Sequence, residues 1–225
     1  MKRAGVMLIL TLSAVAAMLV SCSGGAYNTV MTWLGFDMKD YESEPMVRRV
    51  TEDDSAYGEI TRIISMLTTD SVVISPFESP RGASSGNRDA ILNYMLGTGY
   101  AAYSGNSELL ASAAEEYPQY NITTLIPEKD YESAVYRNFG GDESVTHGDS
   151  IRYTYLPRVR AYTTTGQPIT VSVTLTVTSC IETEHTYRVS FSLTDSTGET
   201  RRYTSMFMKR EDETIYMRFL RAPEE

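Results

Sequence analysis

The chain has 225 residues, of which 42% are apolar and 22% are charged, and its formal net charge is −9. These fractions are typical of a globular protein, so they argue against a largely disordered chain and against a protein with many membrane spans. The acidic charge and the lack of a long basic patch argue against nucleic-acid binding. Two cysteines cannot build a disulfide framework.

The first residues have the order of features found in a secretory signal peptide. Lys2 and Arg3 are followed by an uncharged, mostly apolar run over residues 5–20. This run is somewhat short for a bilayer span, which needs about 20 residues. It ends in Leu-Val-Ser-Cys at residues 19–22, with Ser-Gly-Gly after the cysteine.

That ending resembles the lipobox of bacterial lipoproteins, and the resemblance covers residues 1 to about 25 only. It implies that residues 1–21 are a signal peptide, cleaved just before Cys22, and that Cys22 carries acyl chains such as palmitate. The protein would then be lipid-anchored on the extracytoplasmic face of a bacterial cell membrane, since several acyl chains anchor stably where one does not. A plain signal peptide and an uncleaved anchor are the alternatives.

The segment behind the anchor is polar and loop-like, so residues 22–52 are expected to form the lipidated cysteine and a tether. Thirty flexible residues reach about 30 Å, which clears the lipid head groups. An apolar group around Trp33 could lie on the membrane surface as a short helix or pack onto the domain. A single domain is expected to follow over residues 53–225.

Apolar residues with helical spacing dominate the first half of that domain. Ile60, Ile63, Ile64 and Leu67 share one face of a predicted helix. Pro127 is suited to the first turn of another helix, and Gly140-Gly141 to its end. The expected helices are 55–68, 87–97, 107–116 and 127–139, with an extended segment at 70–77 and a Pro/Gly/Ser loop at 79–86.

From Ser150 the apolar spacing changes from helical to alternating. Residues 169–178 alternate Ile, Val or Leu with Thr or Ser, which is typical of a half-buried strand. The expected strands are one that begins at 151–155, then 169–178, 187–193, 203–208 and 214–220. Short connections of this kind join antiparallel neighbours.

Helices followed by strands indicate the α+β class, with the N-terminal helices packed on a C-terminal antiparallel meander of about five strands. The order and length of the elements are similar to the cystatin-like or NTF2-like class. That resemblance rests on topology alone, and it implies a curved sheet that wraps its helices and can enclose a pocket.

One loop carries the residue types of a metal site. Asp142, Glu143, His147 and Asp149 lie within eight residues, and oxygen and imidazole ligands suit a divalent cation. The spacing matches no known metal-binding motif, and acidic loops are usually solvated, so these four are weak candidates. No cofactor is expected.

Tyrosine is unusually frequent, with 16 residues. Exposed tyrosines offer rigid, amphipathic contact area to a protein, peptide or sugar partner. Tyr94, Tyr100, Tyr103, Tyr153 and Tyr155 are the predicted binding surface. The alternative is that the strand tyrosines are ordinary β-formers with one wet edge.

No catalytic constellation stands out. A Cys180–His185 nucleophile pair would need an electropositive setting and a geometry that nearness in the sequence does not imply. We therefore expect a binding module at the membrane, with a protein, peptide or envelope polymer as partner, rather than an enzyme. An envelope hydrolase with scattered carboxylates is the alternative, and facing carboxylates in a deep pocket would favour it. A small-ligand carrier with a pocket between helices and sheet is the third hypothesis.

Overall fold

The computed structural model describes residues 41–141 and 145–222. The chain divides into two units, residues 1–44 and residues 45–225, and every helix and strand given below lies in the second. The predicted leader, Cys22 and most of the predicted tether lie outside the described residues. None of the helices in the described part combines the length and hydrophobicity of a membrane span.

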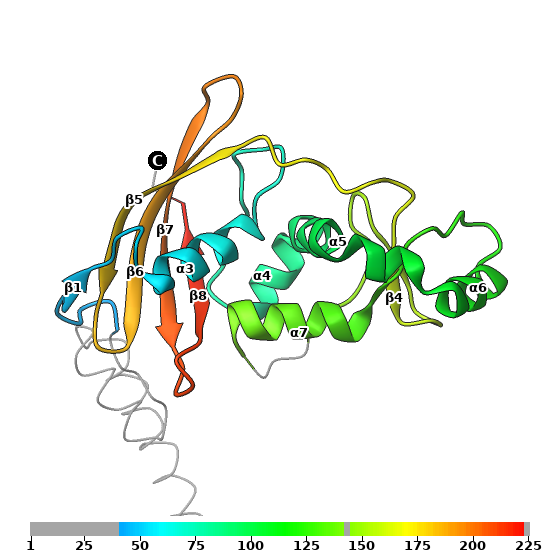
Figure 1. Ribbon diagram of the computed structural model, residues 1–225, viewed down its shortest axis with the longest axis horizontal. Helices are drawn as coiled ribbons and strands as arrows, with labels where there is room; N and C mark the ends of the chain where they lie inside the picture. The colour runs from blue at the N-terminus through cyan, green and yellow to red at the C-terminus, as the bar shows by residue number, and fades with distance from the viewer. Residues whose placement is uncertain (1–40, 142–144, 223–225) are drawn as a thin grey trace, which may run out of the picture. The chain divides into compact units, whose positions relative to one another are not determined.

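Helices fill the first half of the described unit. Figure 1 shows α3 crossing one face of the larger sheet, while α4, α5 and α7 lie together beside it. The described ranges contain α3 (Ser55–Ser65), α4 (Pro80–Gly86), α5 (Arg88–Gly105), α6 (Ser107–Glu116) and α7 (Glu128–Phe139).

The strands form two antiparallel sheets. The larger sheet has the order β1-β5-β6-β7-β8 and the smaller has the order β2-β4-β3. Their bounds are β1 (Arg48–Arg49), β2 (Ile126–Pro127), β3 (Thr154–Leu156), β4 (Ala161–Thr163), β5 (Thr174–Glu182), β6 (Thr186–Thr194), β7 (Thr200–Lys209) and β8 (Ile215–Arg221).

The α+β class is therefore confirmed, and β5 to β8 form the expected meander. Two details differ from the expectation. The strand predicted from Ile151 joins the smaller sheet as β3. The fifth strand of the larger sheet is β1, which comes from the predicted tether and pairs with the end of β5, so the compact unit begins before residue 53. The cystatin-like or NTF2-like comparison stays a prediction.

The main core lies between the larger sheet and the helices α3, α4, α5 and α7. Ile60, Ile63 and Ile64 are completely buried, as the helical spacing predicts. They belong to one apolar cluster with the alternate residues of β6, among them Phe191 and Leu193. A separate small cluster beneath α6 contains Ala113, Leu125, Leu156 and Ala161.

The segment 79–86 forms helix α4, so the predicted loop is wrong. Ser79 caps this helix, since its Oγ accepts a hydrogen bond from the Gly82 amide at 3.2 Å. Pro80 occupies the first helical position, where its missing amide proton costs nothing. The Pro and Ser residues that suggested a loop are therefore the start of a helix.

The next helix, α5, continues past its predicted end at Gly97 to Gly105, with a kink at Gly99. The predicted extended segment at 70–77 is held by the sheet without becoming one of its strands. The buried Tyr203 hydroxyl accepts from the Ile74 amide at 2.9 Å and donates to the Val72 carbonyl at 2.7 Å. This segment forms one wall of the site described next.

Candidate functional site

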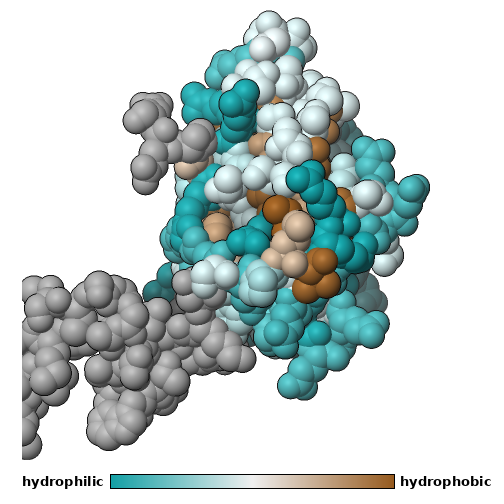
Figure 2. Space-filling model, turned by 90° about the vertical axis from the view of Figure 1, so that its left-hand side faces the viewer, coloured by the Kyte–Doolittle hydropathy of each residue, from teal (hydrophilic) through white to brown (hydrophobic). Residues whose placement is uncertain are grey.

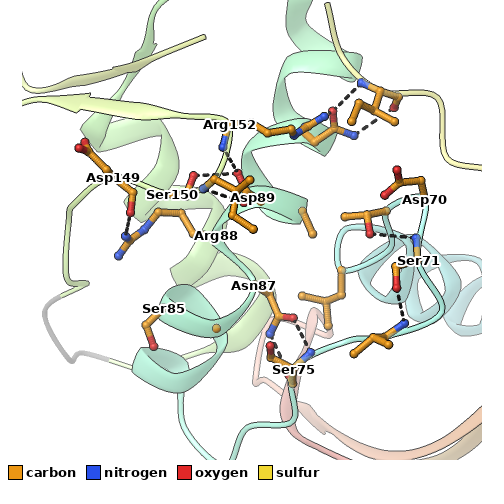
Figure 3. Close-up of a pocket in the computed structure, with 18 residues that line it drawn as sticks. Asp70, Ser71, Ser75, Ser85, Asn87, Arg88, Asp89, Asp149, Ser150 and Arg152 are labelled. Carbon is orange, nitrogen blue, oxygen red and sulfur yellow. Dashed lines mark hydrogen bonds between the residues drawn. The ribbon is translucent and has the colours of Figure 1, made fainter. Parts of the chain in front are cut away.

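A pocket of about 610 Å³ opens where three segments distant in sequence meet. They are the extended segment after α3, the junction of α4 with α5, and residues 149–152, as Figure 3 shows. Its volume is within the range of small-ligand sites. Its lining includes no residue of the described strands, so it does not lie on the sheet face where the carrier hypothesis expects a pocket.

Asp89, in the first turn of α5, fixes the segment 150–152 beside the pocket (Figure 3). One carboxylate oxygen accepts from the Ser150 hydroxyl at 2.8 Å and the Arg152 amide at 3.1 Å. The other accepts from the Ile151 amide at 3.1 Å. Hydrogen bonds to a charged acceptor are stronger than neutral ones, so this one carboxylate sets the position of the segment.

Arg88 holds the chain just before that segment. Its guanidinium donates to the carbonyls of Thr146, Gly148 and Asp149 at 2.7, 2.9 and 3.2 Å. The Arg88 Nε is buried and has no hydrogen-bond partner among the described residues. The start of α5 therefore anchors the whole path from residue 146 to residue 152.

Two buried asparagines join the remaining walls. The Asn87 side chain accepts from the Ser75 amide and donates to the Ser75 carbonyl, both at 3.0 Å. Asn93 does the same with the backbone of Ile169, at 2.8 and 3.1 Å, and also accepts from the Arg152 guanidinium at 2.8 Å. Each asparagine makes the pair of bonds that a neighbouring strand would make, which keeps these loops in place.

The pocket combines this polar interior with exposed apolar side chains. Ile151 is 95% exposed, Val73 is 51% exposed and Ile169 is 36% exposed, and all three line the pocket. Single exposed apolar residues are normal on protein surfaces, but a group around one pocket is typical of an interaction site.

The pocket also contains three aspartates, which is the feature that the hydrolase hypothesis requires. The Asp89 carboxylate is occupied by two amides and a hydroxyl, and Asp149 accepts from the Tyr155 amide at 2.8 Å. Asp70 lines the pocket without a hydrogen-bond donor among the described residues. Two of the three aspartates thus serve to shape the backbone.

Of the four predicted metal-site residues the structure describes only His147 and Asp149, and it directs these two to different partners. Asp142 and Glu143 lie outside the described residues, and Asp149 is directed to the Tyr155 backbone. His147 instead lies against α7 and the smaller sheet. Its Nδ1 is 2.9 Å from the Tyr162 hydroxyl and its Nε2 is 3.2 Å from a Glu132 carboxylate oxygen.

His147 forms a different potential ligand group with Glu128 and Glu132, one turn apart on α7. The ligand atoms of these three residues lie within 4.8 Å of one another. The arrangement already contains a cation, because the Arg160 guanidinium pairs with Glu128 and lowers the pKa of that carboxyl. A divalent cation would have to displace Arg160, so the geometry favours a structural ion pair.

The predicted tyrosine surface is divided among several places. Tyr153 is buried, and Tyr155 stacks on the His147 ring with centroids 5.2 Å apart. Tyr94 and Tyr103 line a second pocket of about 300 Å³. Tyr100 accepts a hydrogen bond from Gln167 at 2.8 Å. These five residues do not form one continuous binding face.

A steep loss of stability at alkaline pH is expected from three tyrosines in or next to the smaller sheet. Burial raises the pKa of Tyr153, Tyr155 and Tyr162 to about 12, whereas an unfolded tyrosine titrates near pH 10. The folded state therefore keeps protons that the unfolded state loses, so their contribution is complete below pH 10 and is lost as the pH rises to 12. Urea unfolding at pH 8, 10 and 11, with tyrosinate absorbance, measures this.

The matched control for that titration is Tyr136, a largely exposed tyrosine on α7. Replacing Tyr162 with phenylalanine should reduce the alkaline loss of stability, whereas Tyr136→Phe should leave it unchanged. Equal slopes of unfolding free energy against pH in the wild type and in Tyr162→Phe would contradict the assignment.

Cys180 does not behave as a nucleophile in this structure. It is buried at the end of β5, and burial raises the pKa of its thiol to about 11. Only a thiolate is nucleophilic, and little of it exists at neutral pH with such a pKa. Cys180 contributes to the apolar core instead.

Sequence analysis did not identify Asp89, Asn93, Val73 or Ile169 as site residues, and Ile151 was assigned to a strand. No family model, curated protein or solved structure matches this chain.

Proposed function

We propose that this chain is a lipid-anchored, extracytoplasmic binding module that holds a polypeptide segment in the pocket beside α5. The feature that supports this most is the group of exposed apolar side chains, Val73, Ile151 and Ile169, around a polar interior. Protein interfaces combine apolar contacts with hydrogen bonds in this way. A polypeptide supplies both, through its side chains and its amides.

The hydrogen bonds that the charged side chains of the pocket already make favour binding over hydrolysis. Asp89 and Asp149 are occupied by backbone amides, and the Arg88 guanidinium by backbone carbonyls. A general acid or base needs a carboxyl group that can reach the substrate and exchange a proton with it. Rigidly held loops, in contrast, reduce the entropy lost when a partner binds.

The anchor is the part of the proposal that rests on sequence alone. Replacement of Cys22 by serine should abolish incorporation of labelled palmitate and release the protein from the membrane fraction. Retained labelling or unchanged fractionation would contradict the lipoprotein assignment without affecting the pocket.

Site-specific photo-crosslinking in intact cells tests the pocket. With benzoylphenylalanine at position 151, we expect one discrete, protease-sensitive adduct. The same group at position 136 is the matched control, because Tyr136 is also exposed and does not line the pocket. We expect at least about tenfold less adduct there, as for loss of one central contact. The additional substitution Val73→Asp should weaken the adduct at position 151.

Other outcomes distinguish the remaining hypotheses. Equal adducts at positions 151 and 136, or none at 151, would contradict a binding site here. A protease-resistant adduct that a glycan hydrolase removes would indicate an envelope polymer. The hydrolase alternative rests on Asp70, and it predicts that turnover of an envelope substrate is lost in Asp70→Asn while the crosslink remains.

A further inference from the structure

The outer edge of β5 is only partly covered within the described residues. On its inner side β5 pairs with β6 from Thr174 to Glu182. On its outer side β1 pairs with Ile181 and Glu182 alone, and the Val50 amide donates to the Cys180 carbonyl at 3.0 Å. The first half of the strand, residues 174–177, has no partner strand on that side among the described residues.

Open strand edges invite pairing with another chain, and natural proteins usually protect them with charges, proline or a bulge. This edge has little such protection. Residues 161–181 contain no charged side chain, although 22% of the whole chain is charged. The bulge in β5 lies between Val177 and Ser179, after the open part, and Pro168 lies before it.

The two faces of the open edge are also suited to a neighbouring strand. Val173, Leu175 and Val177 are half-buried and contact the main core, whereas Thr174 and Thr176 on the other face are exposed. A strand added here would continue the hydrogen-bond ladder and cover the apolar face at the same time. Figure 2, which views the molecule from the side of β1, β5 and β6, shows pale, weakly polar residues over much of its upper half.

We propose that β5 pairs with β5 of a second copy of this chain, antiparallel and about a two-fold axis, so that the two larger sheets become continuous. A second copy suits this edge because the strand is complementary to itself. In a two-fold antiparallel pair, valine and leucine lie on one face and threonine on the other in both copies. An acidic chain repels its own copies over most of its surface, but an uncharged strip does not.

Cysteine crosslinking of the full chain in its membrane is the first test. With Thr176→Cys or Thr174→Cys, mild oxidation should produce a covalent dimer of twice the chain mass from at least one of the two positions. The matched control is Thr204→Cys, because Thr204 is also exposed but lies on β7, an interior strand that is paired on both sides. The wild-type chain is oxidised in parallel as the background, because it retains Cys22 as well as the buried Cys180, and only a dimer above that background supports the inference.

Mass in solution provides an independent measurement. The detergent-solubilised full chain should sediment as a dimer. Thr176→Lys should raise its dimer dissociation constant at least about tenfold, because it places a lysine of each copy in the uncharged strip that the two strands share. Thr204→Lys should leave the mass unchanged. Should Thr176→Lys not fold, Thr174→Lys takes its place.

Three results would overturn the inference. They are a wild-type monomer at micromolar concentration, unchanged mass in both edge variants, and crosslinks from position 176 to another protein in place of a second copy. The inference does not rest on the proposed function, because the crosslinks from position 151 and from position 176 are measured separately.

Discussion

Replacing Gly140 with alanine is expected to destabilise the folded protein by about 4 kcal/mol, as the sum of backbone strain and overpacking. Gly140 ends α7 with φ 74° and ψ −174°, a backbone conformation that is essentially restricted to glycine. An added Cβ would also lie 2.5 Å from Cδ2 of the Tyr216 ring. Movement of that ring would also disturb its contact with the Arg210 guanidinium, which lies 4.6 Å over the ring centre.

Two other glycines separate the causes of this effect. Gly198 has φ 87°, but no atom lies within 4 Å of an added Cβ. Gly198→Ala should therefore cost only the backbone strain, about 1 kcal/mol. Gly58 lies inside α3 with no atom within 4 Å of an added Cβ, so Gly58→Ala should stabilise by about 0.5 to 1 kcal/mol. Urea unfolding of the three variants measures all three values. A cost for Gly140→Ala no larger than that for Gly198→Ala would mean that Tyr216 gives way.

Patterns that depend on local chemistry predicted much of the fold. The helical spacing of Ile60, Ile63 and Ile64 identified α3, and the alternation of apolar and polar residues identified β6. These patterns succeed because burial on one face imposes the period of the element on the sequence.

The strand predicted at 169–178 shows the limit of this reasoning. Its alternation is as regular at Ile169 and Val171 as at Leu175, yet β5 begins only at Thr174. Thr174 pairs with Thr194, the last residue of β6, so the earlier residues have no strand to pair with there. A pattern records which residues favour a strand, but the partner decides where the strand begins.

The candidate site could not be predicted because its parts are joined only in space. Asp89 and Asn93 contact residues at 150–152 and at 169, about sixty to seventy-six positions away along the chain. His147 was singled out as a weak metal-ligand candidate with the acids of its own loop, but its partners Glu132 and Tyr162 come from a helix and a strand. Glu128 and Glu132 could have been paired earlier, since they are four residues apart on a predicted helix.

Replacing Asp89 with alanine should cost about 3 kcal/mol of stability and remove most binding at the pocket. The substitution deletes a charged acceptor and leaves the amides of Ile151 and Arg152 without their partner. A charge-assisted hydrogen bond contributes about 1.5 to 3 kcal/mol. The three hydrogen bonds to Asp89 together contribute less than three times that amount, because the carboxylate is partly exposed to water. Urea unfolding gives the stability, and hydrogen exchange at residues 151 and 152 shows whether the segment opens.

The consequence for function follows from which contact is lost. Ile151 is positioned only through its backbone, because its side chain is 95% exposed. Asp89→Ala should therefore lower the crosslinking yield from position 151 about tenfold, as expected when a central contact loses its position. Asp89→Asn, which keeps an acceptor oxygen, should have a smaller effect on both measurements.

Asp212 provides the matched control. Its carboxylate also accepts hydrogen bonds from the backbone and hydroxyl of a neighbouring residue, Thr214, but in a turn that does not line the pocket. Asp212→Ala should leave the crosslink from position 151 unchanged. If Asp89→Ala increased hydrogen exchange at residues 151 and 152 yet preserved the crosslink, the segment would not need its fixed position, and a pre-organised polypeptide site would be excluded. If Asp89→Ala removed both the protection from hydrogen exchange and the crosslink from position 151, the aspartate would act on binding through the backbone that it holds.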